Sequence, residues 1–370
     1  MKKKVIYVLL AVVLIGALCG CGKLYFPAET DPVTDVTEEN PQGWFEVHYL
    51  DVGQADATLV VCDGEFLLID GGNAGDSSLL YAYLKEMGAK EIKYMICTHV
   101  HEDHVGGLSG ALNYARVETV FCPTDSWDSE GFANFQKYLA AQGKGITIPE
   151  AGTRFNLGTA TCQILAVNSD LADVNDTSIV LRIEYGETSF LFSGDAGQNV
   201  EAAILDAGFD IRSTVLKVPH HGSDTSLSDR WLASAMPEYA VISVGKRNSY
   251  GHPDESILRK LREEEVAVFR TDLQGHIVCK SDGIDVRFEV QKNPNADVWV
   301  QDAPVSDRVE PTASEDGSVI SYVINTKSEQ FHRPDCSGVA QMKEENRQET
   351  TLSREDLIAL GYSPCGNCKP

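Results

Sequence analysis

The chain has 370 residues, 43% of them hydrophobic, which is enough for one domain of about 250 residues and a small additional module. Its 55 acidic residues outnumber its 31 basic residues and give a formal net charge of -24. So acidic a chain repels nucleic acid at long range, which excludes binding driven by overall charge and is the main argument against a nuclease.

Residues 1–21 have the features of a secretory signal. Lys2 to Lys4 precede an apolar run from Val5 to Leu18, shorter than the ~20 residues that a spanning helix needs. The run ends in Leu18-Cys19-Gly20-Cys21, which resembles a bacterial lipobox. The resemblance implies an extracytoplasmic lipoprotein held at the bacterial cell membrane by an acyl group on Cys21. An uncleaved anchor with incidental cysteines is the alternative.

Two acidic segments with spaced prolines flank the central part of the chain. Residues 22–43 have almost no apolar periodicity, and we expect a disordered tether there. Residues 293–317 have the same character and are expected to be a linker.

Between these segments, residues 44–292 alternate short apolar strands with amphipathic helices. Strands are expected at 45–50, 57–62, 66–69, 92–97, 120–122, 161–167, 178–184, 189–193, 215–218, 239–244, 266–270, 276–280 and 284–289. Helices are expected at 79–87, 108–115, 132–141, 200–207, 229–235 and 257–264. This α/β alternation predicts two mixed sheets with helices outside both. Cys62, Cys97, Cys122, Cys162 and Cys279 are expected to be buried, without a disulfide framework.

A cluster of histidines and an aspartate follows the strand expected at 92–97. His99 and His101 can project to one side, while Asp103 and His104 face an adjacent point. That arrangement suits two ions a few Å apart, as in two-metal hydrolases. A polar loop that happens to hold histidines is the alternative, but unpaired histidines rarely cluster without a metal or catalytic reason.

The segment from Thr98 to Gly107 resembles the HxHxDH signature of the metallo-β-lactamase superfamily. Further stretches resemble the hydrolase domain of the ComEC competence proteins, although Ala55 stands where that family usually has glycine. These stretches are Leu50 to Ala57, Leu68 to Gly72, Ser193 to Ala196, Lys217 to Ser223 and Tyr250 to Pro253. The resemblance implies a metallo-β-lactamase-like αββα four-layer sandwich.

The same resemblance implies the site residues. Asp195 matches the aspartate that bridges both ions, and Asp70 is expected to orient a ligand histidine, or else to cap the turn before Gly71. His220 and His221 can exchange roles, because neighbours that leave a strand point opposite ways. The one that does not bind metal, here assigned to His220, can donate a proton to the leaving group. The expected metal ligands are His99, His101, Asp103, His104, Asp195, His221 and His252.

Hydroxyl and amide side chains beside these histidines are candidates for contacts with the substrate. They are Ser223, Thr225, Ser226, Asn248 and Tyr250. Two divalent ions, zinc or manganese, would activate water and hold a phosphoryl or acyl oxygen. Together with Lys217, Lys246 and Arg247, the ions would offset the acidic charge near the site.

A separate cysteine cluster lies in residues 318–370. His332 and Cys336 form one close pair, and Cys365 and Cys368 form a second. So small a module cannot bury enough apolar surface alone, so a structural zinc is expected to stabilise this small α+β module. The arrangement resembles the zinc module of Ada-type repair proteins, but His332 replaces a cysteine and makes methyl transfer doubtful. A disulfide between Cys365 and Cys368 is the alternative, and a nucleic-acid contact or an unidentified protein partner remains open.

Three functions are consistent with these features. The first is an exported, membrane-tethered phosphodiesterase or nuclease that acts on DNA or another phosphodiester polymer. The second is a hydrolase of cell-wall or phosphocholine-type diesters, with β-lactam cleavage less favoured. The third is a surface adaptor with structural zinc, which the expected ligand set disfavours because a structural site is closed by four ligands.

Overall fold

The structure, a computed structural model, describes residues 45–168, 173–301, 322–325, 330–340, 342–343, 346–350, 354, 357 and 362–369. The expected signal with Cys21, the tether at 22–43 and the linker from 302 to 317 lie outside these residues. Within the part that the structure describes, no helix combines the length and the apolar character that crossing a bilayer requires.

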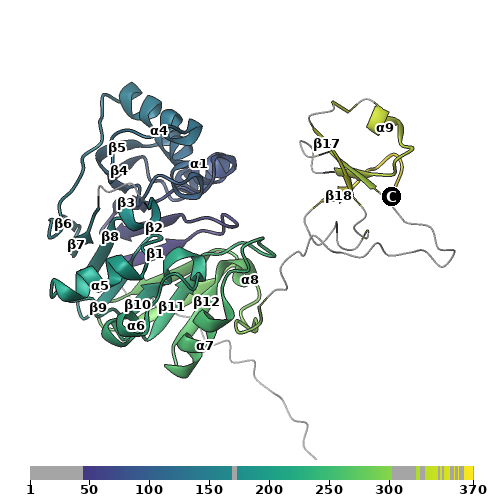
Figure 1. Cartoon of the computed structure of the whole chain (residues 1–370). Coiled ribbons are helices and arrows are strands. Elements are labelled where there is room, and N and C mark those ends of the chain that lie inside the picture. The colour runs from purple at the N-terminus through teal and green to yellow at the C-terminus, as the bar shows by residue number, and fades with distance from the viewer. Residues whose placement is uncertain are drawn as a thin grey trace, which may run out of the picture. The chain divides into compact units, whose positions relative to one another are not determined.

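Residues 45–290 form two seven-stranded mixed sheets (Figure 1). The first sheet has the order β14 (Val286–Val290), β13 (Ile277–Ser281), β1 (Phe45–Tyr49), β2 (Thr58–Cys62), β3 (Glu65–Ile69), β4 (Glu91–Ile96) and β5 (Arg116–Phe121). The second has the order β12 (Ala267–Arg270), β11 (Tyr239–Ile242), β10 (Val215–Lys217), β9 (Thr188–Phe192), β8 (Val180–Tyr185), β7 (Ala160–Ala166) and β6 (Arg154–Leu157). In each sheet a parallel set, β3 to β5 or β9 to β12, continues an antiparallel set.

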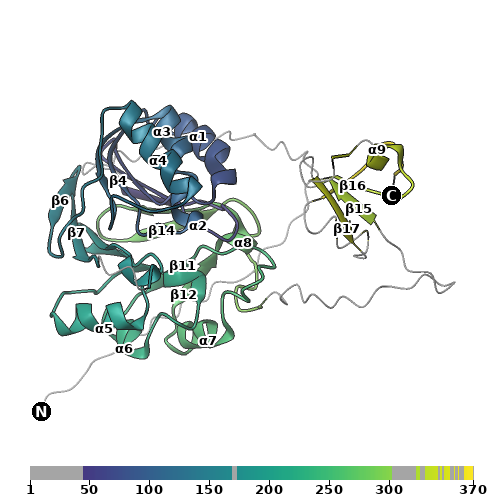
Figure 2. The same ribbon diagram turned by 45° about the horizontal axis from the view of Figure 1, so that its top comes forward.

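Helices cover the outer face of each sheet, so that the layers run helix, sheet, sheet, helix (Figure 2). The first sheet carries α1 (Ser77–Glu86), α3 (Leu108–Tyr114) and α4 (Glu130–Ala141). The second carries α5 (Gln198–Asp206), α6 (Asp229–Ala235) and α7 (Glu255–Glu263). The predicted four-layer αββα sandwich is therefore confirmed.

The strand sequences explain the three apolar layers. Along β2, Leu59 faces the helices, whereas its neighbour Val60 faces the opposite sheet. Strands that are apolar on both faces have to be covered on both sides. Aromatic rings join the sheets at the centre, where the Phe45 ring lies 5.1 Å from that of Tyr185 and 4.7 Å from that of Phe190. The five cysteines of this body are buried and free, as expected.

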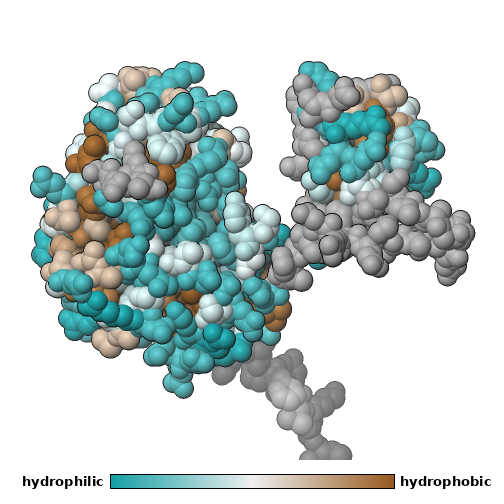
Figure 3. Space-filling view, in the orientation of Figure 1, coloured by the Kyte–Doolittle hydropathy of each residue, from teal (hydrophilic) through white to brown (hydrophobic). Residues whose placement is uncertain are grey.

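The visible face of this body is largely hydrophilic (Figure 3). Functional residues gather at one edge of the sandwich, because the parallel strands all end there. Loops after β3, β4, β9, β10 and β11 leave their carboxyl ends at this edge. Such edges are where open α/β sheets place their sites.

Some elements were not predicted. Strand β6 pairs with β7 through the turn at Gly158, and its alternation of Phe155 and Leu157 with polar residues is a signal that could have identified it. The short helices α2 (Glu102–Val105) and α8 (Thr271–Gln274) have four residues each and are too short to show periodicity.

The chain does not leave the body at 293, where the linker was expected to begin. The buried Arg270 donates from Nη1 to the carbonyl oxygens of Val298 and Val300, at 2.9 and 2.6 Å. The Arg262 guanidinium lies 4.7 Å from the centre of the Trp299 ring. Residues 293–301 therefore pack on the body, because they supply acceptors to a buried cation.

The C-terminal module has its own small sheet and core. The strand order is β17 (Arg347–Thr350), β15 (Tyr322–Asn325), β16 (Gln330–His332) and β18 (Ser363–Pro364), with a short helix α9 (Ser337–Ala340). The core holds Tyr322, Ile324, Phe331 and Leu357. So few apolar side chains are consistent with the expected need for a metal.

Candidate metal centre

The loop that follows β4 carries the HxHxDH residues. It passes through His99 and His101 and enters α2 at Glu102, so that Asp103 and His104 lie in the first turn. Two glycines let this turn pack on the end of β3, since a Cβ on Gly107 would lie 2.0 Å from the carbonyl oxygen of Gly71. The close backbone packing fixes the loop against the sheet.

Asp70, at the end of β3, holds His104. Its Oδ2 accepts a hydrogen bond from Nδ1 of His104 at 2.9 Å, and its carboxylate also accepts from the amide and the hydroxyl of Thr98 at 2.7 and 2.8 Å. The φ of Asp70 is +58°, a strained value of the kind that is common at functional sites. Because Nδ1 carries the proton, Nε2 of His104 is left as a lone pair, as a metal-binding histidine requires.

His221 reaches the same region from the opposite sheet. It follows β10, and both His220 and His221 have left-handed backbone, with φ of +51° and +54°. Nδ1 of His221 donates to the carbonyl oxygen of Ser243 at 3.0 Å, so its Nε2 is also free to bind a metal. Gly222 completes this turn, where a Cβ would come within 2.7 Å of Pro253.

Asp195, in the loop after β9, meets both histidines. Its Oδ1 lies 3.4 Å from Nε2 of His104, and its Oδ2 lies 3.6 Å from Nε2 of His221. Oδ2 of Asp103 lies 3.3 Å from the same His221 nitrogen. Ligand atoms of these four residues all lie within 4.8 Å of one another.

Within the part of the chain that the structure describes, three atoms at the centre of this group have no hydrogen-bond partner. They are Nε2 of His104, Nε2 of His221 and Oδ1 of Asp195, all of them buried. A buried polar atom without a partner costs about 1–3 kcal/mol, and a metal ion removes that cost for all three at once. The donor set of imidazole and carboxylate therefore fits a divalent ion such as zinc or manganese.

His99 and His101 form a second pair beside this group. Nε2 of His99 lies 3.1 Å from Nδ1 of His101, and the ring centres of His99 and His104 are 4.0 Å apart. Burial, helped by the neighbouring His104, lowers the pKa of His99 well below its usual range. His99 is therefore neutral at neutral pH, as a ligand must be.

The carboxylates and histidines of the group shift one another's pKa values. Burial opposes a charge on His104, but Asp195, Asp70 and Asp103 overcome it and raise the His104 pKa. Burial likewise opposes ionisation of Asp195, yet the neighbouring His104 and His221 keep its pKa low. A metal binds the neutral imidazole, so metal affinity at His104 should fall as the pH is lowered.

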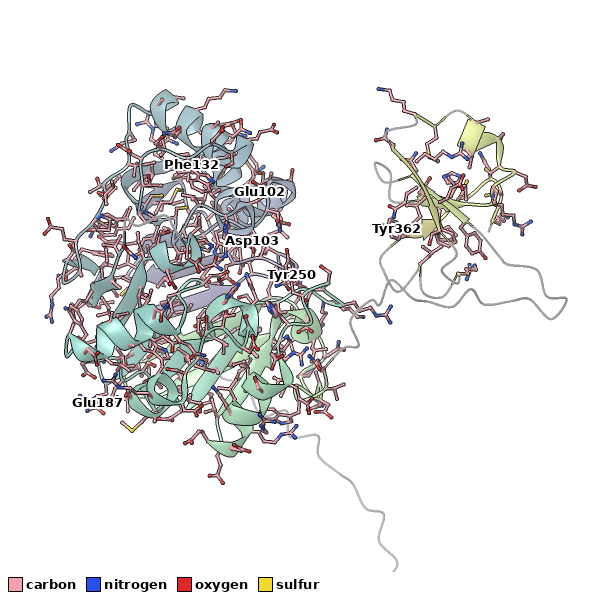
Figure 4. All side chains as sticks on the ribbon, viewed as in Figure 1. Glu102, Asp103, Phe132, Glu187, Tyr250 and Tyr362 are labelled. Carbon is pink, nitrogen blue, oxygen red and sulfur yellow. The ribbon has the colours of Figure 1, made fainter. Side chains whose placement is uncertain are left out.

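An open pocket lies beside the group. It is lined by Gln54, His101, Glu102, Asp103, Asn175, Asp195, His220, His221, Tyr250 and His252. Asp103 and Tyr250 come to it from the two halves of the sandwich (Figure 4). Nε2 of His220 lies 3.6 Å from Oδ2 of Asp195, and its Nδ1 lies 2.9 Å from Oγ1 of Thr225. His220 thus borders the pocket, while His221 belongs to the buried group.

The structure does not bring every predicted residue to the centre. His252 contributes no atom to the group of ligand atoms; its Nδ1 lies 3.5 Å from the Gln54 amide and its ring stacks on Tyr250 with centres 5.7 Å apart. Asn248 bonds the backbone of its own loop, through the carbonyl oxygens of Gly245 and His252 and the amide of Tyr250. Asn248 therefore shapes the loop, because all of its polar atoms are used there.

Of the hydroxyl side chains proposed to contact substrate, some are accessible at a pocket and others are buried in structural contacts. Tyr250 is 72% exposed at the pocket edge, so its ring is accessible. Ser223 is buried and contacts Thr225, which lines an adjoining pocket together with Asp195 and His220. Ser226 is buried and donates to the carbonyl oxygen of Ala196, a structural contact.

One buried ion pair behind the site was not predicted. Nζ of Lys217 lies 2.7 Å from Oδ2 of Asp56, and both side chains are at least nine-tenths buried. Oδ1 of Asp56 lies 3.5 Å from Nδ1 of His221. Lys217 was expected to offset the acidic charge near the site, but its charge is used internally, because it is paired away from solvent. Nothing in the spacing of these residues indicates that they meet.

The C-terminal module gathers its four predicted ligands. Ligand atoms of His332, Cys336, Cys365 and Cys368 lie within 4.8 Å of one another, and all three thiols are free. Neither ring nitrogen of His332 has a hydrogen-bond partner among the described residues of the module. A backbone hydrogen bond at Cys368 lowers the pKa of the Cys365 thiol, which favours the thiolate that a metal binds. The set fits one tetrahedral zinc.

Comparison with known proteins places these features in a family. The profile of the metallo-beta-lactamase superfamily matches residues 50–246. ComE operon protein 3 of Bacillus subtilis is 30% identical over 257 residues, which are 63% of this chain and 32% of that protein. Recombination protein 2 of Haemophilus influenzae is 31% identical over 257 residues, which are 67% of this chain and 30% of that protein. The match thus spans about a third of each relative.

Among solved structures, the metallo-beta-lactamase fold protein YhfI of Bacillus subtilis is similar to this chain with a TM-score of 0.41 and 14% identity. The similarity covers 61% of this chain and 95% of YhfI.

Proposed function

The chain belongs to the metallo-β-lactamase superfamily, and from that premise we propose that it is a dinuclear phosphodiesterase whose substrate is DNA. The observation that carries the proposal is the set of three buried, partnerless atoms of His104, His221 and Asp195 beside an open pocket. A purely structural site would be closed by its protein ligands, whereas this one borders solvent.

At the reacting phosphoryl group, some residues of the chain are placed to hold the ions and others orient those ligands. Divalent ions, when bound, activate water as the nucleophile and offset negative charge on the phosphoryl oxygens. His104, His221, Asp103 and Asp195 are placed to hold them, and Asp70 and Ser243 fix the two rings. No nucleophilic side chain is needed.

His220 is placed to help the leaving group. Its ring is half-buried at the pocket, with Nδ1 beside the Thr225 hydroxyl and Nε2 toward Asp195. Burial lowers the pKa of His220, so the fraction of His220 that is protonated on both ring nitrogens is the acid. As the bond between phosphorus and the leaving oxygen breaks, that form passes its Nε2 proton to the oxygen. The imidazole is left neutral and is protonated again from solvent.

A loop at the pocket edge supports a nucleic-acid substrate despite the chain's negative charge. Lys246 is exposed and Arg247 half-exposed, and neither has an ion-pair partner within the described ranges. They precede Tyr250, whose exposed ring can stack on a base while the cations contact phosphates. The name of the similar recombination protein and the resemblance to competence proteins favour DNA as the first substrate to test.

The test is a comparison of substrates with the full chain loaded with manganese or zinc. Single-stranded DNA, double-stranded DNA, a small phosphodiester and a wall-polymer diester are assayed side by side, with Asp103→Ala as the inactive control. The proposal predicts metal-dependent cleavage of DNA and of the small diester. Cleavage of the wall polymer alone would transfer the function to that substrate class, and cleavage of none would support the adaptor.

We also propose that the protein acts outside the cytoplasm, tethered through Cys21. The support is the lipobox-like sequence from Leu18 to Cys21. Labelled fatty acid should enter the natural chain and not Cys21→Ala, and the variant should leave the membrane fraction or remain unprocessed. A labelled, membrane-bound Cys21→Ala protein would exclude this site of acylation.

A further inference from the structure

One more buried oxygen at the centre lacks a partner, and it belongs to Asn175. This residue begins the short 3-10 turn Asn175–Thr177 between β7 and β8. Its side-chain Oδ1 is buried and has no hydrogen-bond partner among the residues that the structure describes. An amide oxygen buried in this way destabilises the fold unless a ligand satisfies it.

The rest of the turn is fully engaged, so the orphaned atom is specific to Asn175. Oδ1 of Asp176 accepts from the amide of Gly197 at 3.0 Å. Oγ of Ser178 accepts from the amide of Asp195 at 3.1 Å and lies 3.4 Å from Nδ1 of His99. These contacts fasten the turn to Asp195 on one side and to His99 on the other.

Asn175 also borders the same space as the metal-binding side chains. It lines the open pocket together with His101, Asp195 and His220. It lines the adjoining pocket as well, again with Asp195 and His220. Asn175 therefore shares a pocket with His101, and Ser178, three residues further along the chain, contacts His99.

The two proposed ion positions, one at His104 and His221 and one at His99 and His101, differ in the number of nearby protein donors. Asp103, His104, His221 and Asp195 form a group of four donors. His99 and His101 contact each other, and neither belongs to a group of three or more such donors among the residues that the structure describes. A catalytic ion needs at least three protein ligands, and manganese prefers more oxygen than zinc does.

We propose that Oδ1 of Asn175 is a ligand of the ion held by His99 and His101. This inference rests on the two-metal site proposed above. A neutral amide oxygen is a hard, weak donor, so it makes this position the more exchangeable of the two and biases it toward manganese over zinc.

The experiment measures manganese binding, with the metal alone as the probe, to the full chain after chelation. Mn²⁺ is the probe because the thiolate-rich C-terminal set selects zinc over manganese. The bound Mn²⁺ is counted by electron paramagnetic resonance. The natural chain should bind two Mn²⁺ ions. In Asn175→Ala one of them should bind about tenfold to a hundredfold more weakly, while the other keeps its affinity.

Two further variants isolate the role of the amide oxygen. Asn199→Ala removes an exposed amide from the adjoining pocket and should leave both affinities unchanged. Asn175→Asp keeps an oxygen at the position and should bind both ions at least as tightly as the natural chain. Asn175→His should shift this position toward zinc in a competition between the two metals.

Three outcomes overturn the inference. Unchanged affinity for both ions in Asn175→Ala would make the amide a substrate contact or a bystander. Loss of both ions together with a lower melting temperature of the metal-free protein would make it structural, as would loss in Asn175→Asp equal to that in Asn175→Ala. A natural chain that binds no Mn²⁺ at the site would instead contradict the two-metal function itself.

Discussion

Nδ1 of His104 lies 2.9 Å from Oδ2 of Asp70, and both residues are almost fully buried. The contact joins the loop after β4 to the end of β3 and determines which nitrogen of His104 faces Asp195. It is the link through which the first sheet orients a metal ligand.

Replacing Asp70 by Asn should weaken metal binding without disturbing the backbone. Asn tolerates the left-handed φ of this position, but its amide cannot replace the charge that polarises His104. We expect the affinity for manganese or zinc to fall about tenfold to a hundredfold, measured by competition with a chelator. Asp63→Asn is the matched control, because Asp63 also has a left-handed φ but lies in an exposed turn. Equal affinities in both variants would contradict this role.

Replacing His220 by Gln should affect substrates according to their leaving groups. A diester with an alkoxide leaving group needs a proton, so its turnover should fall by about 10²- to 10⁴-fold. A nitrophenyl diester leaves without protonation and should lose much less, and the metal content should stay unchanged. Turnover of both substrates is measured at equal metal loading. A loss of the same size for both would show that His220 acts otherwise, for example as a ligand.

Much of the fold followed from periodicity, because the strands and amphipathic helices of 45–290 bury apolar side chains at regular spacing. Elements such as α2 and α8 did not, since a single turn shows no period. The end of the body was also placed too early, at 292, because nothing in the sequence from 293 to 301 indicates that its carbonyl oxygens bind Arg270.

The site residues, too, could be predicted only where a local sequence pattern marks them. Ligands clustered in one loop, such as His99 to His104, were visible from their spacing, and the motifs around Asp195 and His221 followed from resemblance. The choice between His220 and His221 required the backbone, because two consecutive left-handed residues decide which ring enters the group. The pair of Lys217 and Asp56 and the amide of Asn175 depend on contacts between the two sheets, which no local pattern encodes.

The contact of Arg270 predicts where the chain can be cut. A chain that ends at Gln301 should be as stable as the full body, whereas one that ends at Lys292 should lose about 2–4 kcal/mol of unfolding free energy. The shorter chain leaves the Nη1 donors of a buried guanidinium without the carbonyl oxygens of Val298 and Val300. Urea unfolding of the two chains makes the measurement. Equal midpoints and slopes would show that residues 293–301 contribute nothing.

The stability should depend on pH through His276. Burial lowers the pKa of His276 from its ordinary value of 6.5, and its Nδ1 accepts a hydrogen bond from the amide of Asp51 at 2.8 Å. Below 6.5 the unfolded chain therefore binds a proton that the folded chain resists, and stability is lost as the pH falls through that range. His276→Gln, which keeps an acceptor, should lose less stability than the natural chain when the pH falls from about 7 to about 5. Parallel unfolding curves at the two pH values test this, and the same pH dependence in both proteins would exclude His276 as a source.

The central claim is that hydrolysis requires ions held around Asp195, and the most direct measurement is turnover of a small phosphodiester against bound manganese. The full chain, stripped of metal, is titrated with Mn²⁺ while bound metal and rate are recorded together, and Asp195→Asn is titrated in parallel. Turnover should be absent without metal and rise until two ions are bound, and the variant should bind at most one and lose about a thousandfold or more in rate. Metal-independent turnover, or a variant that keeps both its ions and its rate, would contradict the account.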